Sequence, residues 1–357
     1  MSEVISSPDD PSLDTLCRAL ASSAEEVDAA GQWPDAQLKL CARYGVYRWF
    51  LAAEDGGLGW TEVDLMRGYV RLSAACMTTT FILTQATGAI RRLAATGSDE
   101  LKGELLHDLL VGDAFTTLGI SHLTTSRRHL AGTALRAEES DHGFLLDGFS
   151  PWVTGGERAD WVLIGAQLDD GRQLLAILPM DLYGVSTDDP AKLVALTASR
   201  TGAVRLNGVK LDRKWLLEGP KENVIAGATG AKTGGLQTSA LAVGLAGRAV
   251  EFLTDECEHR SDLREATAGL RGEQAELEES LLGLAAGNPV CSSEQLRIAA
   301  NSLVLRATQA ALAAAKGTGY VAGHPVGRWC REAMFFLVWS CPESVMLSNL
   351  CELAGID

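Results

Sequence analysis

The chain has 357 residues, of which 46% are hydrophobic, and a formal net charge of -15 at pH 7. This length exceeds what one hydrophobic core usually serves, so we expect two or three packed domains. The excess of acidic residues argues against a nucleic-acid-binding protein, because such proteins need a basic face to contact phosphates.

No window of the sequence reaches the roughly 18 uncharged apolar residues that cross a bilayer, and the acidic start MSEVISSPDDP lacks the basic region of a signal or transit peptide. We therefore expect a soluble, cytoplasmic protein without membrane insertion. Eight cysteines are scattered without a CxxC pair, which favours free thiols, and we assign them neither a disulfide nor a metal. The adjacent arginines Arg91-Arg92 and Arg127-Arg128 are interpreted as solvated surface charges.

Residues 1–113 have a helical pattern. After Pro11, apolar residues repeat at the i, i+3, i+4 spacing of one buried helix face. Thr61 can cap a second helix after the glycine-rich break at residues 56–60, and a third helix is predicted to begin at Ser98 and stop at Gly112. The predicted inner positions of the first two helices are Leu13, Leu16, Cys17, Leu20, Ala21, Leu65, Met66, Tyr69 and Leu72.

Residues 114–220 change to a period of two, in short apolar runs separated by Gly, Asp and Pro turns. Strands of this length and spacing predict a small antiparallel barrel or sandwich. Residues 221–357 return to long Ala- and Leu-rich helices, interrupted at residues 287–295, which predict an antiparallel helical bundle. The expected fold class is therefore α+β, with three domains in this order.

Four segments resemble, in order and at matching separations, the acyl-CoA dehydrogenase family over nearly the whole chain. They are AAEDGGLGWTEVD, ATGSDELKGELLHDLLVGDAF, WVTGGERADWVLIGA and KGTGYVAGHPVGRWCREAMFF. The resemblance implies a helical N-terminal domain, a central antiparallel β-barrel and a C-terminal four-helix bundle. It also implies FAD as cofactor, an acyl thioester of coenzyme A or acyl carrier protein as substrate, and a homodimer or homotetramer.

The most specific segment begins at Trp152 and is similar to the family's Trp-Ile-Thr-Asn-Gly motif at the flavin. The resemblance implies that Trp152 packs against the isoalloxazine and Thr154 hydrogen-bonds near flavin N5, with Val153 between them. An aromatic wall beside a hydroxyl and a glycine-rich backbone also suits a flat ring that is polar only along its edges. The alternative is that Trp152 is a core residue of the barrel and Thr154 a turn residue.

Three further segments correspond to cofactor contacts of the family. GISHLTTSRRH resembles the family's loop at the flavin and its pyrophosphate, with Ser121 in place of a Thr, and Ser126 with Arg127 in place of a Gly-Ser; arginine is a plausible phosphate ligand. His122 then stands at a glutamate position, although a lone loop histidine is more often a surface residue.

The segment DLREATAGLRGEQ resembles the dimer-spanning Arg-x-x-Phe-Gly…Gln element and keeps Arg264 and Gln274. In the later glycine-rich loop, Gly317 and Gly319 are implied to touch the adenosine end of the cofactor, often from the neighbouring subunit. The alternative is that both glycines only cap helices. Lys316 replaces the first glycine of the family's loop.

The family's catalytic glutamate is replaced. It follows the Arg-Asp-Ala segment, and counting from Arg331 puts Ser340 of LVWSCPES at its place. A serine hydroxyl is far too weak an acid to serve as a resting general base. Glu343 is the candidate substitute, but Ser340-Cys341-Pro342-Glu343 is interpreted preferentially as a capping box with Pro342 in the first helical turn.

Three functions are compatible with this sequence. The first is an FAD-dependent oxidoreductase that carries out α,β-dehydrogenation of an acyl thioester. The second is a flavin-dependent monooxygenase of the same fold, favoured by the missing glutamate, whereas the C-terminal glycine-rich run favours the dehydrogenase. The third is a catalytically degenerate paralogue that binds flavin or an acyl group.

Overall fold

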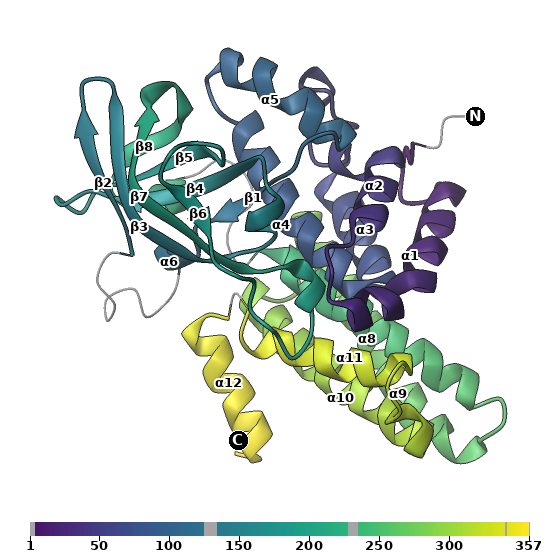
Figure 1. The fold of residues 1–357 in the computed structure, drawn as a ribbon. Coiled ribbons are helices and arrows are strands. Elements are labelled where there is room, and N and C mark those ends of the chain that lie inside the picture. Colours follow the sequence, from purple (N-terminus) through teal and green to yellow (C-terminus); the bar gives the residue numbers. More distant parts are fainter. Residues whose placement is uncertain (1–3, 125–133, 228–234, 340, 357) are drawn as a thin grey trace.

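The computed structural model describes residues 4–124, 134–227, 235–339 and 341–356. Figure 1 shows helices at both ends of the sequence packed together, with a β-sheet region on one side of them. The order of helices, strands and helices agrees with the prediction from sequence.

The N-terminal segment is helical, as predicted. Thr61 forms a capping box with Asp64, and Ser98 accepts from Leu101 N at the start of α5, which ends at Gly112 in a left-handed conformation (φ 79°). Ala21, predicted to face inward, is exposed. The helices are α1 (Pro11–Ala30), α2 (Asp35–Arg43), α3 (Glu62–Ala75), α4 (Met77–Ala94) and α5 (Asp99–Val111). The other predicted inner positions are buried in every case except Cys17, which is partly buried.

The central segment forms one eight-stranded sheet in the order β6-β7-β3-β2-β4-β5-β8, with β1 paired to β4. Most pairings are antiparallel, as predicted, but β1 and β2 each pair with β4 in parallel. A short helix, α6 (Ser121–Thr124), follows β1. The strands are β1 (Thr116–Gly119), β2 (Leu135–Ser140), β3 (Gly143–Val153), β4 (Trp161–Gln167), β5 (Gln173–Pro179), β6 (Val185–Thr187), β7 (Gly202–Asp212) and β8 (Leu216–Lys221).

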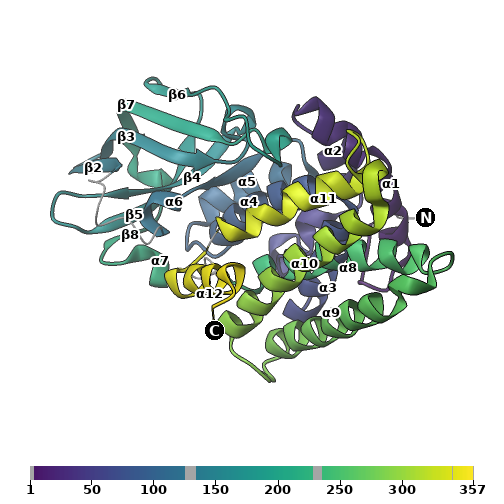
Figure 2. The same ribbon diagram turned by 90° about the horizontal axis from the view of Figure 1, so that it is seen from below.

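The C-terminal segment is again helical. The predicted break at residues 287–295 separates α9 from α10, which Ser292 begins through a capping box with Gln295. Figures 1 and 2 show α8, α9, α10 and α11 running alongside one another. The helices are α7 (Val224–Gly227), α8 (Leu236–Glu256), α9 (Arg264–Ala285), α10 (Ser293–Gly319), α11 (Pro325–Ala333) and α12 (Glu343–Ala354).

The three segments make two hydrophobic cores. One lies inside the β-sheet region, and the other joins the N-terminal helices, the C-terminal helices and a few residues of the sheet. The N-terminal and C-terminal helices approach each other closely where α8 contacts α3. A Cβ atom at Gly244 would overlap both Ser73 Oγ and the carbonyl oxygen of Val70, so only glycine allows this approach.

The last helix corrects one prediction. α12 begins at Glu343 with Pro342 at the N-cap position, and no side chain caps it. The capping box of Ser340 and Glu343 is therefore wrong, because the helix starts too late for residue 340 to be its cap; Ser340 itself lies outside the described residues. α12 projects from the bundle (Figures 1 and 2) and exposes an apolar stripe that includes Leu347, Leu350 and Leu353.

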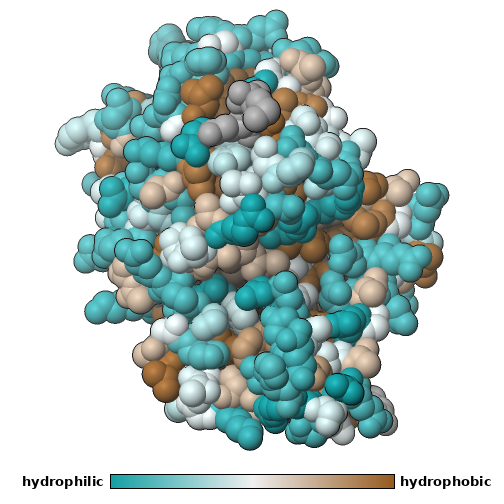
Figure 3. All heavy atoms as spheres, turned by 90° about the vertical axis from the view of Figure 1, so that its right-hand side faces the viewer, coloured by the Kyte–Doolittle hydropathy of each residue, from teal (hydrophilic) through white to brown (hydrophobic). Residues whose placement is uncertain are grey.

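The surface is mainly polar. On the side that Figure 3 presents, hydrophilic side chains predominate and hydrophobic ones are scattered among them. Within the described ranges, no helix combines the length and the hydropathy that a bilayer crossing requires. Arg92, expected at the surface, is instead buried near the end of α4, whereas Arg91 pairs with Glu62 at 2.6 Å; Arg127 and Arg128 lie outside the described residues.

Candidate functional site

A β-bulge at the end of β3 sets the orientation of Trp152. Ser150 is opposite Val204 of β7 and Val153 is opposite Gly202, so that three steps along β3 match two along β7. The extra residue shifts the alternation of side chains. Ser150 and Val153 both face the core of the sheet region with no exposed surface, whereas Trp152 is 58% exposed. The alternative in which Trp152 is a core residue is therefore wrong.

Thr154 is buried and belongs to a row of three hydroxyl groups. Its Oγ1 lies 3.1 Å from Oγ1 of Thr201, which lies 2.8 Å from Oγ of Ser199. The two chain segments are also joined through the backbone, because Gly155 N donates to the carbonyl oxygen of Ser199 at 2.9 Å. Gly155 has the left-handed φ of 63° that such a turn needs. The sequence motif predicted a role for Thr154, but it did not predict the hydroxyl partners Thr201 and Ser199, which are 45 or more residues away.

Ser121 opens α6, which contacts β3. Its Oγ is buried and has no hydrogen-bond partner among the described residues. A buried hydroxyl without a partner is costly, so a ligand that hydrogen-bonds there would be stabilised. Ser126 and Arg127, predicted to act beside it, lie outside the described residues.

His122, expected more often at a surface, is largely buried. Its Nε2 donates to the carbonyl oxygen of Gly165 at 2.7 Å, which leaves Nδ1 as the unprotonated nitrogen of the neutral ring. Nδ1 is buried without a partner among the described residues. Burial lowers the pKa of His122, and the hydrogen bond to Gly165 opposes this shift less strongly. We therefore expect a neutral imidazole beside Ser121 at neutral pH.

The remaining predicted cofactor residues lie elsewhere in the chain. Arg264 is exposed at the first residue of α9, and Gly317 and Gly319 are near the end of α10. Figures 1 and 2 both show this end of the bundle far from β3. Gln274, midway along α9, donates to Glu278 at 2.9 Å and lines a hollow of about 600 Å³ against the start of α3. One chain thus does not bring these residues to Trp152.

The two glycines have different surroundings. A Cβ at Gly319 would crowd Ala315 and Leu312, whereas Gly317 faces open space. The backbone break of this loop falls on Lys316, with φ 54° and ψ -145°. This is a conformation that glycine adopts far more readily than lysine. Lys316 thus holds a glycine-like conformation at the position where the family resemblance places a glycine.

Two polar side chains of one helix, α10, hold the turn that precedes residue 340. Arg297 of α10 donates to the carbonyl oxygen of Trp339 at 2.8 Å, and Asn301 donates to that of Phe336 at 3.0 Å. Burial lowers the pKa of Arg297 to about 10, so the guanidinium remains charged at neutral pH. Phe335 stacks on Trp339 with ring centroids 5.0 Å apart. Hydrogen bonds from α10 therefore hold the backbone of this turn in place.

The carboxylates near this turn differ in availability. Glu343 is exposed at the first residue of α12. Glu332, at the end of α11, is completely buried, and Arg328 Nη1 lies 3.1 Å from each of its oxygens. A carboxylate held in this way is occupied by its ion pair. In the part of the chain that the structure describes, no group of three His, Cys, Asp or Glu side chains is arranged to hold a metal ion.

Comparison with known proteins agrees with this architecture. The family model described as "Acyl-CoA dehydrogenase, N-terminal domain" matches residues 13–113. A probable acyl-CoA dehydrogenase of Bacillus subtilis, YngJ, is 21% identical over 338 residues, which cover 88% of each chain.

Two solved structures share the fold along the whole chain. A glutaryl-CoA dehydrogenase from Mycobacterium smegmatis, in complex with FADH2, matches with a TM-score of 0.81 and 20% identity over 97% of this chain and 95% of that one. A nitrososynthase from Micromonospora carbonacea var. africana matches with a TM-score of 0.76 and 19% identity over 96% and 94%. Residues 13–113 thus match the N-terminal domain of acyl-CoA dehydrogenases, and the distant relatives and the fold of the whole chain are similar to members of that family.

Proposed function

We propose that the protein is an FAD-dependent oxidoreductase that acts on an acyl thioester by α,β-dehydrogenation. The observation that carries this proposal is the bulge of β3, which turns Trp152 outward beside Thr154 at the motif that resembles the family's flavin segment. A large aromatic side chain exposed for more than half of its surface is a suitable wall for a flat ring.

The residues present fit one half of FAD well. Trp152 and Thr154 would hold the isoalloxazine, and the unpartnered hydroxyl of Ser121 would gain the hydrogen bond that it lacks. Ser126 and Arg127 would serve the pyrophosphate. When bound, FAD would accept the hydride that leaves the β-carbon of the thioester.

The adenosine half would be held by a second copy of the chain. Arg264, Gly317 and Gly319 lie at the far end of the bundle from Trp152, and Gln274 lies midway along α9, so we assign these residues to a flavin on a neighbouring subunit. This supports a homodimer or homotetramer. Lys316 adds a cation in this group of residues, which would suit a phosphate.

Glu343 is the proposed base. Glu332 is unsuitable because Arg328 occupies both of its oxygens. Glu343 is exposed in the single chain and would act on an α-proton only when the thioester lies against the first turn of α12. The carrier, coenzyme A or acyl carrier protein, would be set by the surface around this turn.

The exposure of Glu343 favours a second candidate, a flavin-dependent monooxygenase, which needs no carboxylate base. The nitrososynthase of the same fold is consistent with chemistry other than dehydrogenation on this architecture. A degenerate paralogue that binds flavin or an acyl group without turnover is the third possibility.

One series of measurements separates the three. The purified chain is titrated with FAD and then exposed, without oxygen, to a panel of acyl-CoA and acyl carrier protein thioesters. Bleaching of the flavin absorbance is expected. Unbleached flavin with oxygen consumption on added reductant would instead identify the monooxygenase, and absence of FAD binding would contradict both enzymes. Glu343→Gln should bind FAD normally and abolish bleaching; Glu352→Gln, on the same helix, is the matched control.

A further inference from the structure

We infer that Thr201 is a positioning residue that orients the hydroxyl of Thr154, so that Thr154 donates its proton outward toward a hydrogen-bond acceptor on the ligand. This inference rests on the proposed function, in which that ligand is a flavin whose N5 atom meets Thr154. It adds a residue from the loop before β7 and a direction of hydrogen bonding to the site.

The three hydroxyl groups form a buried, hydrogen-bonded row. Thr154, Thr201 and Ser199 are 3%, 7% and 0% exposed, and consecutive oxygens are 3.1 and 2.8 Å apart. These distances are those of hydroxyl–hydroxyl hydrogen bonds. The loop that carries Ser199 is fastened to the turn after Thr154 by two bonds from Arg200 to Glu157, at 2.7 and 3.2 Å. The row is therefore held in place from both of its sides.

The direction of the row follows from its inner end. Each hydroxyl donates one proton and can accept two. Ser199 Oγ has Thr201 as its one hydrogen-bond partner among the described residues, so its proton is satisfied only when Ser199 donates to Thr201. Thr201 then donates to Thr154, and the proton of Thr154 is left to point out of the row. The opposite direction would bury the Ser199 proton without an acceptor, which is the more costly arrangement.

The outward proton distinguishes the two redox states of a flavin. Oxidised flavin has an in-plane lone pair at N5 and accepts this hydrogen bond, whereas the proton at N5 of reduced flavin faces the Thr154 proton and makes N5 a much poorer acceptor. Hydrogen bonds near this atom are among the means by which a protein tunes the cofactor. The row therefore favours binding of the oxidised form and lowers the midpoint potential of the bound flavin.

The test is the midpoint potential of the FAD-loaded, full-length protein, measured by equilibration with a redox dye. Thr201→Val removes the hydroxyl and nearly preserves the shape. We expect it to reduce the preference for oxidised over reduced flavin five- to tenfold, and hence to raise the potential by about 20 to 30 mV for a two-electron couple. Thr201→Ser should return the potential to that of the parent, and Thr201→Ala is a second hydroxyl-free variant if the valine does not fold.

Two controls make the direction testable. In Ser199→Ala, Thr201 has only Thr154 to donate to, so the outward direction persists and the preference should change less than about twofold. Thr187→Val makes the same substitution at an exposed position of β6 and should leave the potential unchanged. Failure of the parent to bind FAD would overturn the proposed function and this inference together. Normal FAD binding with an unchanged or lowered potential in Thr201→Val, or an equal rise in Ser199→Ala, would overturn this inference alone.

Discussion

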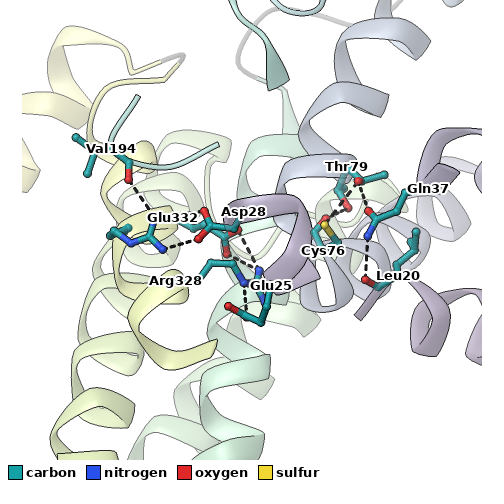
Figure 4. Close-up of polar contacts among 11 residues, drawn as sticks. Leu20, Glu25, Asp28, Gln37, Cys76, Thr79, Val194, Arg328 and Glu332 are labelled. Atoms are coloured by element: carbon teal, nitrogen blue, oxygen red, sulfur yellow. Dashed lines mark hydrogen bonds and ion pairs between the residues drawn. The ribbon is translucent and has the colours of Figure 1, made fainter. Parts of the chain in front are cut away.

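Arg328 and Glu332 are one helical turn apart on α11, and Nη1 of the arginine lies 3.1 Å from both oxygens of the buried glutamate. The same guanidinium donates through Nε to Glu25 of α1 at 2.6 Å (Figure 4). Next to this pair, Arg331 binds Asp28 of α1 and the carbonyl oxygen of Val194, which precedes β7. Five charged side chains and one carbonyl group therefore join all three segments of the chain.

Removal of the buried carboxylate is expected to destabilise the protein strongly. Glu332→Gln would leave Arg328 buried with only Glu25 as its counter-charge, and breaking a buried pair typically costs about 3 to 5 kcal/mol. The measurement is urea unfolding followed by circular dichroism. Glu251→Gln removes the carboxylate of an exposed pair with Arg248 and should cost less than about 1 kcal/mol. Equal losses in the two variants would contradict this account.

Trp152 and Val153 are neighbours with opposite orientations, and alanine substitutions should separate their roles. Because Trp152 is largely exposed, Trp152→Ala should change the free energy of unfolding by less than about 0.5 kcal/mol. Val153→Ala opens a cavity in the core of the sheet region and should cost about 2 kcal/mol. Under the proposed function, only Trp152→Ala should weaken FAD binding at matched folding, as measured by fluorescence titration. A large loss of stability in Trp152→Ala would argue that the ring packs inside the fold.

His122 should make stability depend on pH. Its pKa is lowered in the folded protein by burial, so the unfolded chain takes up a proton first as the pH falls. The contribution is therefore fully present above the unfolded pKa of about 6.5 and is lost as the pH falls through the lower folded pKa. His122→Gln keeps a donor for Gly165 and does not titrate. The parent should lose more stability than this variant between pH 8 and pH 5, and parallel pH profiles would count against a buried neutral histidine.

The left-handed conformation of Lys316 predicts a stabilising substitution. Lys316→Gly should relieve about 1 kcal/mol of backbone strain, because glycine adopts this conformation without a Cβ clash. Lys316→Ala removes the side chain but keeps Cβ, so it should be less stable than the glycine variant. Thermal unfolding of the three proteins gives the order, and an alanine variant as stable as the glycine variant would exclude strain as the cause.

Features set by neighbouring residues could be predicted from the sequence, and those set by distant residues could not. The caps at Thr61 and Ser98 need only the next three residues, and both are confirmed. The burial of Arg92 depends on packing with other segments, and the parallel pairing of β1 with β4 depends on a register across more than 40 residues. A capping motif at residues 340–343 was compatible locally, but α12 begins at its last residue.

In the candidate site, too, features set by neighbouring residues could be predicted and those set by distant residues could not. The motif from Trp152 to Thr154 could be identified in the sequence, but the outward orientation of Trp152 depends on a β-bulge opposite β7 that the motif does not predict. Thr201 and Ser199 lie outside the segments that resemble the family, so their place beside Thr154 could be found only from the fold. The burial of His122 likewise results from the packing of α6 on the sheet.

The shared core of the first and last helices also affects the synthesis of the chain. The helices that end at Val111 complete their apolar packing only against α8, which begins at Leu236, and against α10, which begins at Ser293. A ribosome adds about 5 to 20 residues per second, so many seconds pass between the synthesis of the N-terminal helices and that of α8 and α10. The separate core of the sheet region can form during this time. The middle of this protein can therefore finish folding before its beginning does.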